Sequence, residues 1–386
     1  MKRTGKIYLA AIAFLLLCWI VPRLYFIITV KPSSTPFTMY SCIVKDFVSL
    51  EDRSGKDFVF VDTEGRAYAD SVLPFFYYRL LSSRNDVPEH IAGHVFTGEQ
   101  IELNNFFFTS SPEDVNKDRP DVHLLLESNP PRLELQDADY ALVFRKDGLK
   151  VVEIAENRYE EALQTEFRSA LDSVGFVFPA DQVAGKPDTH KSYDEGYLVT
   201  DSRGELFHIK LRDGRPSVEK INRDGVEIAH LFITENANRR TLGYLFDPLG
   251  RMYILDSQRN IVPTDILADV GKQELLIIGD ILNYTVRVSD INGEDFWALD
   301  SDSFKTVGTF RRDYDEEDSF DLPKYILPFR LTFTSHLSPD ITPRIVDFSW
   351  AGLAVDIVLA ALVALFVFLY RRKLHFFTGE RTQGQV

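Results

Sequence analysis

The stretch YLVTDSRGELFHI, residues 197–209, decides the expected fold class. An apolar run leads into Asp-Ser-Arg-Gly and is followed by a second apolar run. Similar patterns occur as FVFVDTEGRAYA at 58–69 and GYLFDPLGRMYIL at 243–255. Asp at the first position and Gly at the fourth favour a type I turn, and Gly supplies the positive φ that closes a hairpin with a bulge. Each stretch therefore predicts two strands joined by a tight turn.

The Asp-x-x-Gly pattern recurs, and we expect structural turns at Asp62 and Gly65, Asp201 and Gly204, Asp247 and Gly250, and Asp290 and Gly293. Strand-turn-strand units, counted more loosely, are spaced 33 to 56 residues apart. These spacings scatter around the length of a propeller blade. The sequence therefore favours a mainly β, irregular β-propeller-like domain of five or six blades. A general multi-strand α+β domain is the alternative, because the signature motifs of known propeller families are missing.

Two helices are expected to interrupt the β pattern. In residues 157–175 an apolar face recurs at helical spacing, formed by Tyr159, Leu163, Phe167, Leu171 and Val174. Asn157 and Glu160 are expected to form a capping pair at the start of this helix. The second helix is expected over residues 71–83, with Asp70 as its N-cap and Pro74 in its first turn.

Two long apolar segments predict membrane helices at residues 7–30 and 350–370. Each contains one charged residue, and 20 or more apolar residues at about 1.5 Å each cover a hydrocarbon core of about 30 Å. Basic residues precede the first segment and follow the second. Residues 1–6 and 371–386 are therefore expected in the cytoplasm and residues 31–349 outside. A cleaved signal peptide is the alternative for the first segment, but it is long for that role and lacks an A-x-A cleavage pattern.

The single charges in the two apolar segments are Arg23 and Asp356, and helical rise places both near the outer face of the membrane. Charges inside a membrane are rare and usually paired, so an ion pair within the chain or across a complex is one hypothesis. The alternative is that each side chain snorkels to the outer headgroups. Small residues that allow close helix packing accompany Asp356 at four-residue spacing, namely Gly352, Ala360 and Ala364. This face is the expected partner-docking site, with an ordinary Ala-rich anchor as its alternative.

The predicted outer region is acidic, with 35 basic and 56 acidic residues between positions 31 and 349 and thus a net charge of −21. It has no basic stripe that could neutralise phosphates, which argues against nucleic acid as a partner. The chain has two cysteines, and Cys18 falls in the first apolar segment, so no disulfide is expected within the outer region.

The sequence contains no set of residues that is typical of a catalytic centre, so we expect no enzyme activity and no cofactor. His90 and His94 are four residues apart and are weak metal candidates, because Pro88 and Gly93 indicate a loop and no third ligand is marked. The acidic run at 311–321 lacks the ligand alternation of a calcium loop and is expected to be a solvated loop.

The stretches DSVLPFFYYRLLSSRNDVPEHIAG at 70–93 and YLVTDSRGELFHIKLRDGRP at 197–216 lie between the two apolar segments, and the second apolar segment ends in YRRK. With an anchor at each end, this chain resembles an uncharacterised domain-of-unknown-function family of two-pass membrane proteins from Bacteroides-type bacteria. The resemblance implies an inner-membrane protein with a periplasmic domain, found beside ABC-type transporter components. No functional residue is implied by it.

Three functional hypotheses follow. The first is a non-enzymatic accessory subunit of an inner-membrane assembly, with an ABC transporter permease and ATPase as the expected partners. The second is a membrane-anchored periplasmic ligand-binding or sensor module, which is weakened by cytoplasmic segments too short to hold an output domain. The third, a tethered hydrolase, lacks the catalytic residues it needs. The sequence also allows a homo-oligomer.

Overall fold

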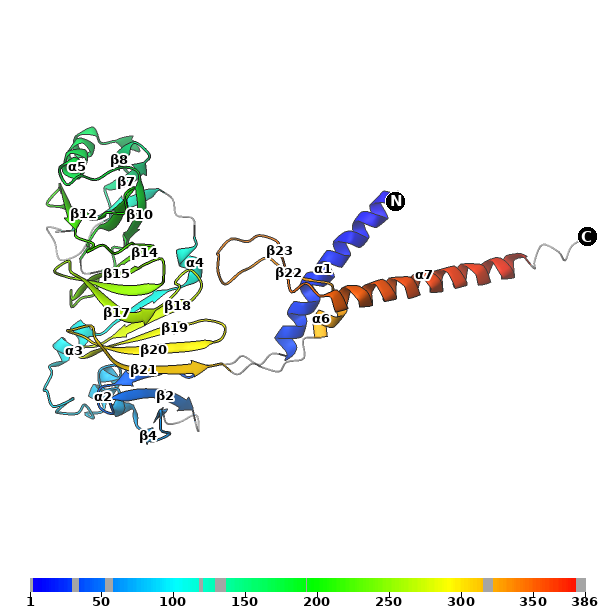
Figure 1. Cartoon of the computed structure of the whole chain (residues 1–386), viewed down its shortest axis with the longest axis horizontal. Helices are drawn as coiled ribbons and strands as arrows, with labels where there is room; N and C mark the ends of the chain where they lie inside the picture. Colours follow the sequence, from blue (N-terminus) through cyan, green and yellow to red (C-terminus); the bar gives the residue numbers. More distant parts are fainter. Residues whose placement is uncertain are drawn as a thin grey trace, which may run out of the picture. The chain divides into compact units, whose positions relative to one another are not determined.

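The protein, seen here as a computed structural model, is described over residues 3–29, 35–52, 58–117, 121–128, 137–191, 193–314 and 322–379 (Figure 1). Most of the predicted acidic loop at 311–321, most of the linker at 31–37 and the ends of both predicted cytoplasmic tails lie outside these residues. The chain forms two compact units. We call Pro36–Tyr314 the β unit, and the remainder, which contains both apolar helices, the helical unit.

Five antiparallel sheets make up the β unit, and in each the strands follow one another in chain order. The first sheet contains β1 (Thr38–Ser41), β2 (Asp46–Asp52), β3 (Phe58–Asp62) and β4 (Ala67–Tyr68). The second contains β6 (Val122–Leu125), β7 (Tyr140–Arg145), β8 (Gly148–Glu153) and β9 (Arg158–Tyr159). The third contains β10 (Ala180–Gly185), β11 (Tyr197–Asp201), β12 (Leu206–Arg212) and β13 (Arg215–Ile221).

The fourth sheet contains β14 (His230–Ile233), β15 (Thr241–Phe246), β16 (Arg251–Asp256) and β17 (Ile261–Leu267). The fifth contains β18 (Glu274–Gly279), β19 (Asn283–Ser289), β20 (Gly293–Asp300) and β21 (Thr306–Asp313). An additional strand from far earlier in the chain, β5 (Phe106–Ser110), pairs with β18 at the edge of this sheet. The chain thus contributes one strand to the fifth sheet before it forms the second sheet.

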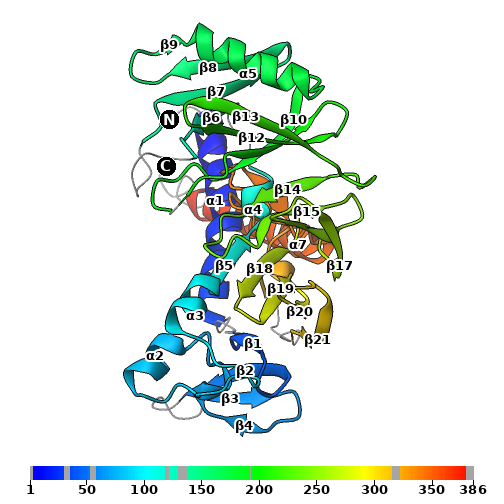
Figure 2. The same cartoon turned by 90° about the vertical axis from the view of Figure 1, so that its left-hand side faces the viewer.

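Shared apolar cores hold the sheets in an order that differs from the order of the chain. The first sheet packs on the fifth, where Phe47 meets Phe296, and the fifth packs on the fourth through a core that contains Ile277 and Phe246. Further cores join the fourth sheet to the third and the third to the second. Figures 1 and 2 show this succession, with β2 and β4 at one end and β7 and β8 at the other.

The contact between the first and fifth sheets includes one arginine from the end of the β unit. The guanidinium of Arg312 donates to Pro36 O at 3.2 Å, to Thr38 Oγ1 at 2.8 Å and to Ser49 Oγ at 2.7 Å. It also pairs with Glu294, whose side chain is buried, at 3.0 Å. The two ends of the β unit therefore meet at this arginine.

The turns predicted from the Asp-x-x-Gly pattern are present, with the hydrogen bonds expected of Asp and Gly at these positions. Asp201 Oδ1 accepts hydrogen bonds from the backbone N–H groups of Arg203 and Glu205, both at 2.9 Å, and the N–H of Gly204 donates to Asp201 O at 2.8 Å. Gly204 has a φ of +73°, in the left-handed region that favours glycine. Asp62 and Asp247 head turns with the same bonds.

Asp290 also heads a turn, but its glycine has a different role. Asp290 Oδ1 accepts from the N–H groups of Asn292 at 2.8 Å and Gly293 at 3.3 Å. Gly293 begins β20, and a Cβ there would lie 2.4 Å from Arg312 O on the neighbouring strand. Close approach of two strands, rather than a positive φ, requires this glycine.

The expected helix at 157–175 is present as α5 (Glu161–Ser173), and Leu163, Phe167 and Leu171 are buried as its periodicity predicts. Its predicted start is wrong. Asn157 adopts a φ of +48° in a turn, and Arg158 and Tyr159 pair with β8 as β9. Glu160 is the N-cap residue but makes no side-chain cap. Arg158 and Tyr159, which the capping pattern assigned to the helix, pair with strand β8 instead.

The prediction of a single helix at 71–83 is also wrong, because the segment forms the short η1 (Asp70–Val72), a turn and then α2 (Tyr78–Ser83). The carboxylate of Asp70 binds Arg84 Nη2 at 2.9 and 2.8 Å instead of capping a helix. Phe75, in the intervening turn, is buried. Two further short helices follow, α3 (Gly98–Asn104) and α4 (Pro112–Val115).

The helical unit contains α1 (Arg3–Thr29), α6 (Leu322–Ile326), β22 (Arg330–Thr332), β23 (Arg344–Val346) and α7 (Trp350–Gly379). Thr4–Ile28 in α1 and Trp350–Tyr370 in α7 are long and apolar enough to cross a membrane, which is compatible with anchoring at both ends. The sequence places everything from 31 to 349 in one outer domain. The structure instead groups the residues after Tyr314 with the apolar helices.

Candidate functional site

The two charges inside the apolar helices are not paired with each other within the described residues. Arg23 is exposed on α1 and makes no hydrogen bond or ion pair there. Asp356 on α7 is half-buried, and its Oδ2 atom is buried without a hydrogen-bond partner. A carboxylate in this position leaves hydrogen-bonding capacity that the described chain does not use.

Gly352, the first small residue of the predicted docking face, packs against the backbone of the same chain at Leu327. A Cβ at Gly352 would lie 2.0 Å from Leu327 O, so the start of α7 touches the backbone just after α6. Ser349 fixes this contact, since its N–H donates to Pro328 O at 2.8 Å and its Oγ accepts from Gly352 N at 3.1 Å. Ala360 and Ala364 are exposed along α7. The face open to a partner is therefore the part around Asp356, Ala360 and Ala364.

The weak metal candidates His90 and His94 lie on a tight hairpin. Ile91 and His94 exchange backbone hydrogen bonds of 2.8 and 3.0 Å, and both intervening residues have positive φ. The two imidazoles therefore do not share a helical face. Within the described ranges, no group of three His, Cys, Asp or Glu residues is placed to hold a metal ion.

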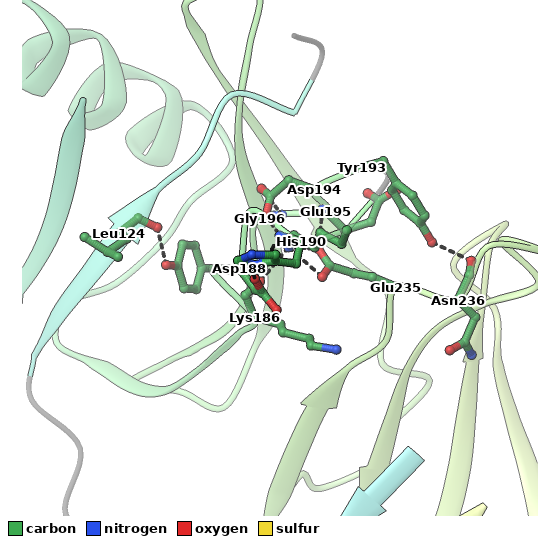
Figure 3. Close-up of polar contacts among 12 residues, drawn as sticks. Leu124, Lys186, Asp188, His190, Tyr193, Asp194, Glu195, Gly196, Glu235 and Asn236 are labelled. Atoms are coloured by element: carbon green, nitrogen blue, oxygen red, sulfur yellow. Dashed lines mark hydrogen bonds and ion pairs between the residues drawn. The ribbon is translucent and has the colours of Figure 1, made fainter. Parts of the chain in front are cut away.

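A buried charge network that the sequence analysis missed joins the third and fourth sheets (Figure 3). The ammonium of Lys191, whose side chain is 9% exposed, donates to Asp194 Oδ1 at 2.6 Å, to Glu235 Oε1 at 2.6 Å and to Lys186 O at 2.5 Å. Figure 3 shows Asp194 and Glu235 close together. Burial raises the pKa of the Glu235 carboxyl. The ammonium protons are all engaged, so this network serves to join the sheets.

Beside this network lies a smaller polar cluster around Glu195. Its Oε2 accepts from Lys210 Nζ at 2.9 Å, and its backbone oxygen lies 2.6 Å from His208 Nε2. Burial lowers the pKa of the His208 imidazole, which favours its neutral form. The cluster borders a cavity of about 230 Å³ that also contacts Arg239 and Arg259.

A larger cleft, of about 700 Å³, runs along the first strands of the second, third and fourth sheets. Its apolar wall includes Phe144, Leu231 and Phe232, and its rim carries the charged residues Lys117, Asp121, Arg145, Lys146, Asp147 and Asp181. None of these six forms an ion pair with another described residue. His123 and His230 also line the cleft, and burial lowers the pKa of His230. The volume is in the usual range for small-molecule sites.

The structure thus defines a mostly β protein of several antiparallel sheets that carries an apolar helix toward each end. Residues 37–299 match a domain of unknown function, DUF4857. The match covers more than half of the chain, so this protein belongs to that uncharacterised family. No curated protein matches it.

Solved structures similar to this chain are distant. PorZ, a surface component of the type-IX secretion system of Porphyromonas gingivalis, is 13% identical over 75% of this chain, with a TM-score of 0.23. The Dos1 propeller (9% identity over 53% of this chain, TM-score 0.26) and the dihydro-heme d1 dehydrogenase NirN (9% over 81%, 0.24) are further examples. The chain spans 33% of the PorZ chain and less than two thirds of the other two. At these TM-scores the likenesses carry no functional argument.

Proposed function

We propose that this protein is a non-enzymatic accessory subunit of a bacterial inner-membrane assembly, with an ABC-type transporter permease and ATPase as its partners. The β unit is then periplasmic, both chain ends are cytoplasmic, and α1 and α7 dock onto the permease. The observation that carries the proposal is the unsatisfied Oδ2 of Asp356 in an apolar helix.

Both charges in the apolar helices carry an energetic cost in a membrane. A charged side chain within a membrane helix is costly to insert, and such residues generally face a protein partner. Arg23 and Asp356 do not neutralise each other in the described structure. A second membrane protein that offers hydrogen bonds or charges of opposite sign at these positions would remove the penalty. The exposed Ala360 and Ala364 would let its helix approach closely.

Replacement of Asp356 by Asn, or of Arg23 by Ala, should reduce recovery of the partner at least several-fold, because each change removes the charge that one apolar helix offers to the partner. Tagged full-length protein would be crosslinked in its own membranes, purified in mild detergent and analysed by quantitative mass spectrometry. Leu24→Ala, an exposed apolar position on α1, is the matched control and should leave recovery unchanged. Purification of the wild-type chain alone, or with copies of itself only, would contradict the proposal.

The cleft along β6, β10 and β14 favours a second candidate function, a membrane-anchored ligand-binding module. As a ligand-binding module, the five sheets would be blades of an irregular propeller-like domain, and the cleft follows the first strands of three of them. Charges of both signs around an apolar wall, without ion pairs among the described residues, suit a small ligand that is itself zwitterionic and partly apolar, such as a short peptide.

A tripeptide with free ends, for example trialanine, should then raise the melting temperature of the full-length protein in detergent. A ligand at 100 times its Kd adds about 2.7 kcal/mol of stability. Lys146→Met should weaken the response, because it removes one charge from the rim. Lys305→Met, at an exposed lysine outside the cleft, should not. If peptides leave the melting temperature of every variant unchanged, this second candidate is wrong.

A further inference from the structure

We propose that the cavity of about 230 Å³ between the third and fourth sheets binds a phosphate group, either as the free ion or on a small organic molecule. Its lining comes from the loop between β10 and β11, from β12, from β15 with the loop before it, and from the turn between β16 and β17. A water molecule occupies about 30 Å³ in the liquid, so the cavity has room for a phosphate group with a small substituent. The proposal depends neither on a membrane partner nor on the ligand of the larger cleft.

The lining of this cavity is cationic, although the region from 31 to 349 has a net charge of −21. Lys210, Arg239 and Arg259 contribute three positive charges and Glu195 contributes one negative charge, which gives a formal charge of +2. His208 also lines the cavity, and burial lowers its pKa and so favours the neutral imidazole. Lys210 pairs with Glu195 at 2.9 Å, which leaves the two arginines as the source of the excess charge. A phosphate group carries about −1.5 to −2 at pH 7 and matches this excess.

Both arginines retain hydrogen-bonding capacity for an anion. The guanidinium of Arg239 makes no hydrogen bond or ion pair with another described residue, and it lies over the buried ring of Tyr193, 4.1 Å from the ring centre. The Nε atom of Arg259 is buried and has no hydrogen-bond partner among the described residues, while its Nη2 atom pairs with the half-exposed Glu219 at 2.7 Å. A buried donor without an acceptor is destabilising, and a phosphate oxygen would supply the acceptor. Guanidinium groups suit phosphate because they donate two parallel hydrogen bonds.

The turn that carries Arg259 has an arginine where similar turns in this protein have a glycine. Asp256 Oδ1 accepts from the N–H groups of Gln258 and Asn260, both at 2.8 Å, and the N–H of Arg259 donates to Asp256 O at 3.0 Å. These are the bonds of the Asp-x-x-Gly turns described above, whose glycines have positive φ. Arg259 adopts the same conformation, with a φ of +68°. A side chain in this region costs free energy, so the turn holds the guanidinium at the cavity at the expense of stability.

Arg239 is held in a turn of the same kind. Its N–H donates to Asn236 O at 2.9 Å, and its φ is +51°. The Tyr193 hydroxyl donates to the same Asn236 oxygen at 2.7 Å, which fixes the ring beneath the guanidinium (Figure 3). Arg239 and Arg259 are the only arginines with positive φ among the described residues, and both line this cavity. Backbone strain of this kind is typical of functional sites. The guanidinium groups, rather than the turns, therefore account for arginine at these two positions.

Isothermal titration calorimetry of the full-length protein in a non-ionic detergent tests the proposal, with inorganic phosphate as the probe and sodium chloride of equal ionic strength as the blank. The wild-type protein should bind phosphate, and it should bind acetate, which has a single charge, several-fold more weakly.

Arg259→Gly separates binding from stability. The glycine suits the positive φ, so the melting temperature without phosphate should not fall. Phosphate binding should weaken by roughly tenfold, the effect of one hydrogen bond between charged groups. Arg239→Gln should weaken binding in the same way. The matched control is Lys45→Gly, because Lys45 is an exposed cation with a φ of +59° in the turn between β1 and β2, outside the cavity. This control should leave phosphate binding unchanged.

Three results would overturn the proposal: no phosphate binding by the wild-type protein, equal binding by the Arg259→Gly and Lys45→Gly variants, or acetate binding as tight as that of phosphate. Glycerol 3-phosphate distinguishes the two sources of the phosphate group. Tighter binding than that of inorganic phosphate identifies an organic phosphate as the ligand, and weaker binding identifies the free ion. Absence of a co-purifying transporter contradicts the proposed function only and leaves this inference intact.

Discussion

Lys191→Met is expected to lower the free energy of unfolding of the β unit by about 3–5 kcal/mol, the usual cost of removing one partner from a buried ion pair. The methionine leaves Asp194 and Glu235, whose side chains are 4% and 2% exposed, without their shared cation. Urea unfolding of the full-length protein in detergent, followed by circular dichroism, measures the loss.

The matched control for this change is Lys272→Met. Lys272 also pairs with a carboxylate, that of Asp269 at 2.7 Å, but both side chains are largely exposed. Exposed pairs contribute little to stability, so this variant should unfold close to wild type. Equal losses in the two variants would show that burial of the Lys191 network does not matter.

The Lys191→Met loss should also depend on pH. Burial raises the pKa of Glu235, so the folded state holds its proton more tightly than the unfolded chain does. Stability linked to such a group is present at low pH and is lost as pH rises through the folded pKa. Without the ammonium the pKa of Glu235 should rise further. The deficit of the variant should therefore be smaller at pH 5 than at pH 8.

Asp280→Asn is the second change with a large expected effect, and its signature is a flatter dependence of stability on pH. Asp280 lies in the turn between β18 and β19, where burial raises the pKa of its carboxyl to about 6 from an ordinary 3.8. A shift of this size corresponds to about 3 kcal/mol. Because the folded pKa is raised, this stability is full below pH 3.8 and is lost as pH rises through about 6. The wild-type protein should lose it and the variant should not.

Asp290 in the next turn of the same sheet provides a control of opposite sign. Both carboxylates accept two backbone N–H groups through Oδ1 at the head of a β-turn. At Asp290, which is less buried, hydrogen bonds led by that from Asn292 lower the pKa. Stability linked to Asp290 is present at neutral pH and is lost on acidification. Free energies of unfolding should show the Asp280 variant deviating from wild type as pH rises from 3.8 through about 6, and the Asp290 variant deviating in the opposite direction as pH falls below 3.8.

What the sequence could predict in this protein is what neighbouring residues determine. The turns at Asp62, Asp201 and Asp247 follow from four-residue patterns, and the buried face of α5 follows from a period of 3.6. The two apolar helices follow from composition alone. These features need no knowledge of the rest of the chain.

The features that depend on distant residues could not be predicted. Lys191 and Glu235 are 44 residues apart, and no local pattern marks them as partners. Phe106–Ser110 pairs with β18 across more than 160 residues, so its place in the fifth sheet has no signal in its own sequence. The wrong start of α5 has the same origin, since pairing with β8 outweighs a capping pattern at Asn157. The cleft of about 700 Å³ depends on the order of three sheets, so it could not be predicted from the sequence either.

Arg312, which joins the two ends of the β unit, has a consequence for the time course of folding. Its bond to Thr38 Oγ1 spans 274 residues. The first sheet leaves the ribosome early, but the surface it packs on is complete only after β21 has been made. Contacts of such long range form slowly, because closing a long loop costs entropy before any contact is gained. The earliest sheet to be synthesised is therefore the last to dock, and until then its apolar face, including Phe47, is open to chaperones.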